Sequence, residues 1–124
     1  MTNSDPSRVV TDYQMAKLAK AIEHFRTFDK EIPAQVIATF LYVASHDDCS
    51  KVDLEKALAF STASGSRNTD YLSDFHRLNK AGLGLIAKYR DQTNRRRQIL
   101  KLSPKGRILV KQLKDILYGS SDLG

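Results

Sequence analysis

The chain has 124 residues, of which 41% are hydrophobic and 27% charged, the composition of an ordinary globular protein with one domain. Its single cysteine, Cys49, excludes an internal disulfide and predicts a cytoplasmic protein, and its apolar runs predict neither a secretory signal nor a membrane span. The net charge of +6 predicts an acidic partner, either nucleic acid or an anionic membrane surface.

The first half of the chain predicts three helices that follow a flexible arm, residues 1–11. Apolar residues then recur at helical spacing, which predicts an amphipathic helix over residues 12–29. A second helix should begin at Pro33 and be apolar nearly all round, as a helix in the middle of a core is. Residues 46–49 are expected to form a turn, and Ser50 is the expected cap of a short third helix.

The next segment predicts a fourth helix. Residues 61–66 are small and polar, which favours a turn or a loose loop. Residues 67–81 are expected to form a helix with Tyr71 and Phe75 on its apolar stripe, and Gly82 is suited to end it.

The last part of the chain predicts a β-hairpin and a final helix. Residues 85–90 and 98–102 alternate between apolar and polar side chains, which predicts two strands joined by a polar loop. Ser103 is the expected cap of a helix over residues 104–118, and residues 119–124 are expected to be a flexible tail.

This order of elements predicts a mainly α fold with a small β-hairpin. A winged helix-turn-helix core over residues 50–107 is expected within one domain of residues 12–118. Terminal helices, residues 12–29 and 104–118, are expected to flank that core.

The basic charge is concentrated in residues 88–107. This segment holds eight basic residues and one acidic residue, Asp91, so it carries +7 in a chain whose total is +6. Three arginines, Arg95 to Arg97, lie at the tip of the predicted hairpin, where they would meet an array of phosphates. The segment therefore predicts a DNA-binding wing.

The chain resembles the MarR family of bacterial winged-helix regulators over residues 50–107. The resemblance rests on Leu78 to Leu83 (LNKAGL), on the arginines of the wing, and on Leu102 to Arg107 (LSPKGR). It implies a recognition helix in the major groove and a wing that enters the adjacent minor groove. It also implies that the terminal helices form a two-fold dimer and that a small phenolic effector binds in a pocket beneath it.

The residues expected to carry the function fall into three groups. The recognition-helix residues expected to contact DNA are Arg67, Asn68, Thr69, Ser73 and Arg77. The wing residues expected to contact DNA are Lys88, Arg90, Arg95, Arg96 and Arg97. The dimer interface is expected to consist of two apolar stripes, Met15, Leu18, Ile22 and Phe25 on the first helix and Leu109, Leu113, Ile116 and Leu117 on the last.

The sequence thus predicts a sequence-specific, dimeric, DNA-binding transcriptional regulator that represses by occluding a promoter. It is not expected to be an enzyme or to need a cofactor, since it contains no nucleophile elbow, glycine-rich phosphate loop or paired carboxylates. Residues 46–49 (HDDC) are not expected to hold a metal, because four consecutive side chains do not easily converge on one ion.

Two alternatives stay open at this stage. One is a winged helix that serves as a protein-interaction module, for example a phage or plasmid factor that docks on a host protein. The other is a non-specific architectural binder of duplex DNA.

Overall fold

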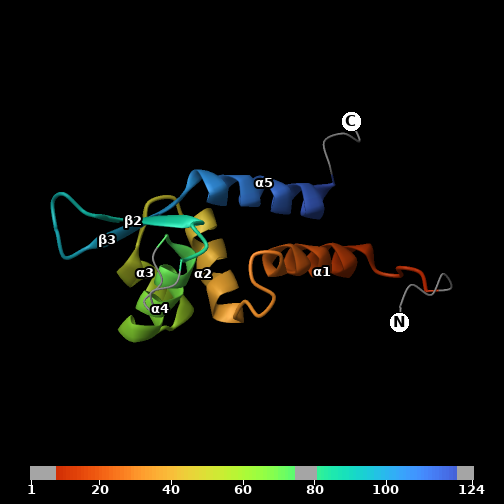
Figure 1. Ribbon diagram of the computed structural model, residues 1–124, viewed down its shortest axis with the longest axis horizontal. Coiled ribbons are helices and arrows are strands. Elements are labelled where there is room, and N and C mark those ends of the chain that lie inside the picture. Colours follow the sequence, from red (N-terminus) through yellow and green to blue (C-terminus); the bar gives the residue numbers. More distant parts are fainter. Residues whose placement is uncertain (1–7, 75–80, 120–124) are drawn as a thin grey trace.

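The computed structural model describes residues 8–74 and 81–119. Within these residues the helices are α1 (Tyr13–Arg26), α2 (Ala34–Ser45), α3 (Lys51–Leu58), α4 (Thr62–Leu72) and α5 (Pro104–Tyr118), and the strands are β1 (Cys49–Ser50), β2 (Ile86–Arg90) and β3 (Gln98–Leu102). Figure 1 shows an elongated molecule with the β2–β3 hairpin at one end and α1 and α5 side by side at the other. Helices α2, α3 and α4 lie between these two ends.

The three strands form one antiparallel sheet in the order β1-β3-β2. Tyr89 pairs with Ile99 across the hairpin, and Cys49 of β1 pairs with Leu100 of β3. The predicted hairpin is therefore present, and a third strand of two residues was not predicted, since Cys49 was expected in a turn and Ser50 as a helix cap. The sheet closes one side of the helical core and holds the hairpin at its base.

Side-chain caps begin most of the helices. Asp12 accepts a hydrogen bond from the Met15 amide at 3.1 Å, and Ser50 accepts one from the Asp53 amide at 3.0 Å. Ser103 accepts one from the Gly106 amide at 3.0 Å, so α5 begins at Pro104 as predicted. Each of these bonds satisfies an amide that the helix itself leaves without a partner.

The hydrophobic core joins side chains from every helix and from the sheet. Phe25 of α1 and Phe40 of α2 meet edge to face with their ring centroids 5.7 Å apart. Leu54, Leu72 and Leu100 are fully buried and come from α3, α4 and β3. Burial of each such side chain stabilises the fold by about 1.5–3 kcal/mol. Because α4 and the hairpin contribute to the same core, their positions relative to each other are fixed.

Gly106 allows the start of α5 to lie against the chain just before β2. A Cβ atom at this position would be 2.1 Å from the carbonyl oxygen of Leu85, closer than any real contact. The Ser103 hydroxyl also donates to the Gly84 carbonyl at 2.6 Å. These contacts attach the final helix to the base of the hairpin.

Helix α4 differs from the prediction at both ends. It begins at Thr62, because Ser61 caps it by accepting a hydrogen bond from the Ser64 amide at 3.1 Å, so most of the predicted loop over residues 61–66 is helical. It ends at Leu72, with Ser73 as its C-cap, whereas the prediction extended to residue 81. Residues 75–80 of that predicted helix lie outside the described residues.

Candidate nucleic-acid interface

The wing is an organised loop whose basic side chains point outward. Asp91 accepts hydrogen bonds from the Thr93 hydroxyl at 2.8 Å and from the Thr93 amide at 2.9 Å. These bonds, with the nearby Arg97 guanidinium, hold the pKa of the Asp91 carboxyl below its usual range. Because Asp91 is ionised and engaged within the loop, it fixes the loop's shape while leaving the arginines to face outward.

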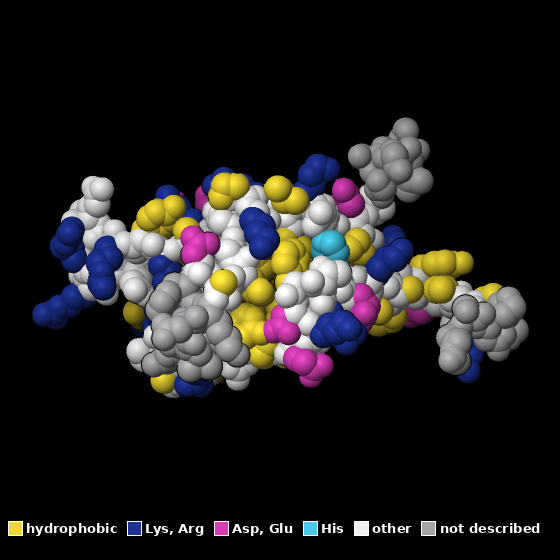
Figure 2. Space-filling view, in the orientation of Figure 1, with side chains coloured by type: hydrophobic (Ala, Val, Ile, Leu, Met, Phe, Trp, Pro, Cys, Tyr) yellow, Lys and Arg dark blue, Asp and Glu magenta, His cyan; other side chains and the backbone are white. Residues whose placement is uncertain are grey.

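Arg95 and Arg96 carry the open charge of the wing. Both side chains are exposed, and neither forms an ion pair with another residue of the described part of the chain. Arg97 is also exposed, but it lies 3.4 Å from Asp91. Arg90 donates from Nη1 to the Arg95 carbonyl at 2.8 Å and so supports the tip. Figure 2 shows basic side chains gathered at the far end of the hairpin.

Lys88 lies at the base of the wing and is partly buried. Its ammonium group donates to the Asp70 carboxylate of α4. This ion pair connects the hairpin directly to α4, so the charge of Lys88 is already engaged within the chain. Lys88, which was predicted to contact DNA, is therefore occupied by Asp70 and is not an open charge of the wing.

The inner face of α4 was assigned wrongly from the sequence. Gly65, Asn68, Thr69 and Leu72 are all buried, at the spacing of one helix face. The Asn68 amide donates to Gln35 Oε1 at 3.2 Å, and the Thr69 hydroxyl donates to the Gly65 carbonyl at 2.8 Å. Asn68 and Thr69 therefore face the core and not solvent.

Ser73 was also expected on the outer face, and this too is wrong. It is 8% exposed, and its hydroxyl donates to the Asp70 carbonyl at 3.0 Å at the C-terminal end of α4. Arg77, the last predicted recognition residue, lies outside the described residues. Of the five residues predicted on this helix, Arg67 is the one that the structure describes as exposed.

The open face of α4 is formed mainly by residues that sequence reasoning placed in a loop. Thr62 and Ala63 are exposed, and Ser64 and Ser66 are half-buried. Arg67 extends from this face and donates to the Ser64 hydroxyl at 3.0 Å. The pattern of Ser and Thr at potential cap positions (Ser61 and Thr62) is the signal that could have shown this helix start.

The terminal helices use part of their predicted dimer stripes inside the subunit. Phe25, Leu109 and Leu113 are buried in the core of the same chain, so their assignment to an intersubunit surface is wrong for the chain as described. They are buried because α1 and α5 pack on α2 and the sheet as well as on each other. The exposed part of the stripes is Met15, Leu18, Ile22 and Leu117, and Ile116 is half-buried.

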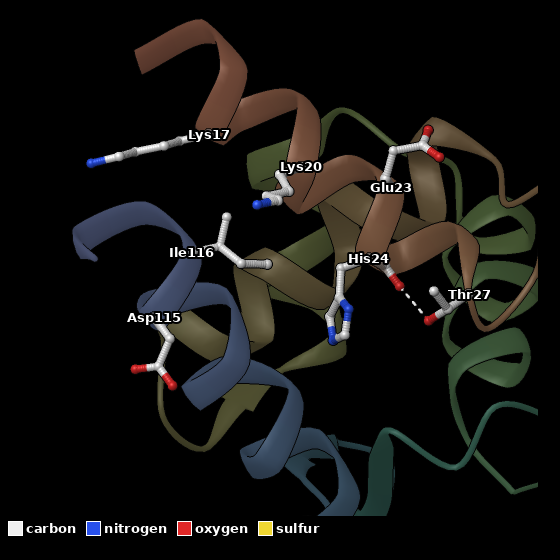
Figure 3. A pocket seen from close by; sticks show the side chains of 7 residues that line it. All are labelled: Lys17, Lys20, Glu23, His24, Thr27, Asp115 and Ile116. Carbon is white, nitrogen blue, oxygen red and sulfur yellow. Dashed lines mark hydrogen bonds between the residues drawn. The ribbon is translucent and has the colours of Figure 1, made fainter. Parts of the chain in front are cut away.

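A groove of about 650 Å³ lies between α1 and α5. Figure 3 shows Lys20 and His24 reaching from α1 toward α5, with Ile116 of α5 pointing back toward them. The His24 ring is 2.7 Å from Gln112 Oε1, and since that oxygen only accepts, His24 Nε2 is the donor. The groove thus has Ile116 and the acidic Asp115 on its α5 side, and a polar wall with two lysines, Lys17 and Lys20, on its α1 side.

The described residues contain no group of metal-binding side chains and no helix that is long and apolar enough to cross a membrane. Cys49 is buried, and burial raises the pKa of its thiol. Among the described residues, the exposed arginines of the wing are therefore the best candidate for a binding site.

Comparison with known proteins identifies the fold. No family model and no curated protein matches the sequence. Among solved structures, the chain is similar to S. aureus MepR in complex with DNA, at 24% identity and a TM-score of 0.64 over 84% of this chain and 75% of that one.

Two further structures show the same likeness. One is a mutant E. coli MarR in complex with operator DNA, at 17% identity and a TM-score of 0.61 over 85% of this chain and 68% of that one. The other is a MarR transcriptional regulator from Methanosarcina mazei, at 21% identity and a TM-score of 0.60 over 86% of this chain and 67% of that one. The chain thus has the winged-helix fold of the MarR regulators, and the predicted fold class is confirmed.

Proposed function

We propose that the chain is a cytoplasmic, dimeric transcriptional regulator that binds specific duplex DNA sites and represses by occluding a promoter. The observation that carries the proposal is the pair of exposed arginines without ion pairs, Arg95 and Arg96, on a wing beside the open polar face of α4. The similar structures of MepR and MarR are complexes with DNA, which supports DNA binding as the function.

Helix α4 would read base edges in the major groove with its N-terminal half. Short side chains at Thr62, Ala63 and Ser66 allow the helix to approach the bases closely. Arg67 is long enough to form two hydrogen bonds with a guanine. The wing would place Arg95 in the adjacent minor groove, with its neighbours on phosphates.

A dimer would supply two such units. Met15 and Leu18 of α1 are 56% and 50% exposed, and Leu117 of α5 is 38% exposed, so an apolar surface is left open at the end opposite the wing. A second copy that packs here by two-fold symmetry would cover this surface and give two recognition helices about one DNA turn apart.

We propose that a small phenolic effector binds in the groove between α1 and α5. Ile116 offers an apolar wall for a ring, and the Lys20 ammonium group offers hydrogen-bond donors for its oxygen. Such a ligand would bias how α1 and α5 pack and thereby the spacing of the two recognition helices. A shift in thermal midpoint on addition of a simple phenolic acid, lost in the Ile116→Glu variant, would support it.

Selection from a randomised duplex library, with genomic DNA as competitor, tests the proposed function and its two rivals. We expect enrichment of a palindromic sequence that genomic DNA does not displace. Binding without enrichment would favour the non-specific architectural binder. No duplex binding at all would overturn the proposal and leave the protein-interaction module, which a pull-down in the presence of nuclease would then address.

A further inference from the structure

A small cleft separates the wing from the helix-turn-helix unit. It has a volume of about 260 Å³, and its walls come from α3, α4, β2, the wing loop and the first residue of β3, Gln98. Lys51 and Glu55 of α3, Thr62 of α4, Arg90 of β2 and Arg96 of the wing loop line it. We propose that this cleft binds a single phosphate group of the DNA backbone, an assignment that rests on the proposed function and assigns a defined contact within it.

The balance of charge in the cleft favours an anion. Lys51 donates to the Glu55 carboxylate, both residues are 9% exposed, and this buried pair is close to neutral. Arg90 and Arg96 are left as the uncompensated charges. Arg90 commits Nη1 to the Arg95 carbonyl and retains its other N–H donors, and Arg96 has no ion pair with a described residue. Both arginines line the cleft, and the N–H donors that remain on their guanidinium groups suit phosphate oxygens.

Thr62, the first residue of α4, lines the same cleft and brings the start of the helix to it. The Ser64 amide is capped by Ser61 Oγ, and the Gly65 amide donates to the Ser61 carbonyl at 2.9 Å. The amides of Thr62 and Ala63 have no such acceptor in the described part of the chain. Unpaired amides at the start of a helix, with the positive end of its dipole, favour a phosphate.

The position of the cleft identifies the phosphate as one from the DNA backbone. In the proposed complex α4 occupies a major groove and the wing occupies the adjacent minor groove. One sugar-phosphate strand separates those two grooves, so that strand must pass between α4 and the wing. The cleft lies at this place, since both Thr62 of α4 and Arg96 of the wing loop line it.

The buried Lys51–Glu55 pair keeps the cleft in shape. A Cβ atom on Gly65 would be 2.2 Å from Glu55 Oε2, so α3 and α4 approach closely at this pair. Lys51 Nζ also lies 3.4 Å from the Thr62 carbonyl at the first residue of α4. Lys51 is thus a positioning residue for the start of α4, while Arg90 and Arg96 make the proposed contact.

Neutral methylphosphonate groups, placed one at a time along the selected duplex, provide the test. With the wild-type protein, we expect one position in each half-site at which the neutral group weakens binding by about tenfold. In the Arg90→Met/Arg96→Met variant, a neutral group at the same position should weaken binding by less than about twofold, because the side chains that contact that phosphate have been removed. Lys111→Met, which removes an exposed charge from α5, should leave the whole profile as in the wild type.

Each result decides the assignment. Equal losses for the wild type and the double variant at every position would overturn the shared phosphate contact, although the duplex would still be bound and the proposed function would stand. A wild-type protein that binds no duplex would overturn both. If inorganic phosphate shifts the Thr62 and Ala63 amide resonances and the selected duplex does not compete with it, the occupant is a free phosphorylated ligand and the backbone assignment is wrong.

Discussion

The two ends of the molecule leave opposite kinds of side chain exposed. At the wing, Arg95 and Arg96 are exposed without an ion pair among the described residues. At the other end, Met15 and Leu18 are apolar and at least half exposed. This difference is what the proposed function requires, which is an array of phosphates as the partner at one end and an apolar surface as the partner at the other.

Each end also holds residues of the same type that serve the fold. Lys88 is a wing lysine, yet it is paired with Asp70. Leu109 is on the same helix as Leu117, yet it is fully buried and Leu117 is not. Each end therefore contains two classes of side chain, those that contact their own chain and those that are left for a partner. Substitutions in the first class should change the stability of the fold, and substitutions in the second should change binding to the partner.

The largest effect is expected on the buried side of α5. Leu109→Ala should lower the free energy of unfolding by about 2–5 kcal/mol, because it removes a fully buried side chain and leaves a cavity. Ile108→Ala, at the neighbouring position that is 60% exposed, should change it by less than about 0.5 kcal/mol. Urea unfolding of the two variants measures this. Equal losses would contradict the division of α5 into a core face and an open face.

The next effect is on assembly. Leu18→Glu should weaken the dimer at least about thirtyfold, since a charge in an apolar interface costs on the order of 2 kcal/mol. The fold should be unaffected, because Leu18 is half exposed. Gln14→Glu, at another exposed position of α1, introduces the same charge as a control. Sedimentation equilibrium gives the dissociation constants, and an unchanged value for Leu18→Glu would remove α1 from the interface.

At the wing, removal of both open arginines is expected to weaken binding to duplex DNA at least about tenfold and to flatten its dependence on salt. The change is Arg95→Ala/Arg96→Ala. A matched variant, Lys111→Ala/Lys114→Ala, removes two exposed charges from α5 instead. Gel-shift titrations at several salt concentrations compare them. If both variants bind alike, net charge and not the wing determines affinity.

The smallest effect is expected at the ion pair between α4 and the wing. Asp70→Asn and Lys88→Met should each weaken duplex binding about threefold, by loosening the wing relative to α4, with the salt dependence unchanged. The charge-swapped Asp70→Lys/Lys88→Asp variant should recover part of the loss. A salt dependence that falls in Lys88→Met would show that Lys88 contacts phosphate directly.

The hairpin and the start of α5 were predictable because their signals are local. Alternation between apolar and polar residues determines a strand pair, and Ser103 followed by Pro104 is a strong helix start. Strand β1 was missed because its two residues are extended only as partners of β3. No local sequence pattern predicts a strand of two residues.

The face of α4 was not predictable from periodicity. Gly65, Asn68 and Thr69 occupy buried positions where apolar side chains are usual, so the apolar stripe expected of a helix is absent. Their burial depends on partners far away in the sequence, Gln35 for Asn68 and Glu55 for Gly65. When the buried face of a helix consists of small and polar residues, it can be distinguished from the exposed face only when the positions of the neighbouring elements are known.

Amide chemical-shift mapping of the isotope-labelled protein, titrated with the selected duplex, tests the central claim most directly. We expect the largest shifts at Thr62 to Arg67 and at Arg95 to Arg97, with little change at the exposed positions of α1. Shifts confined to α1 and α5, with the wing unperturbed, would contradict the claim that the charged end of the molecule binds DNA.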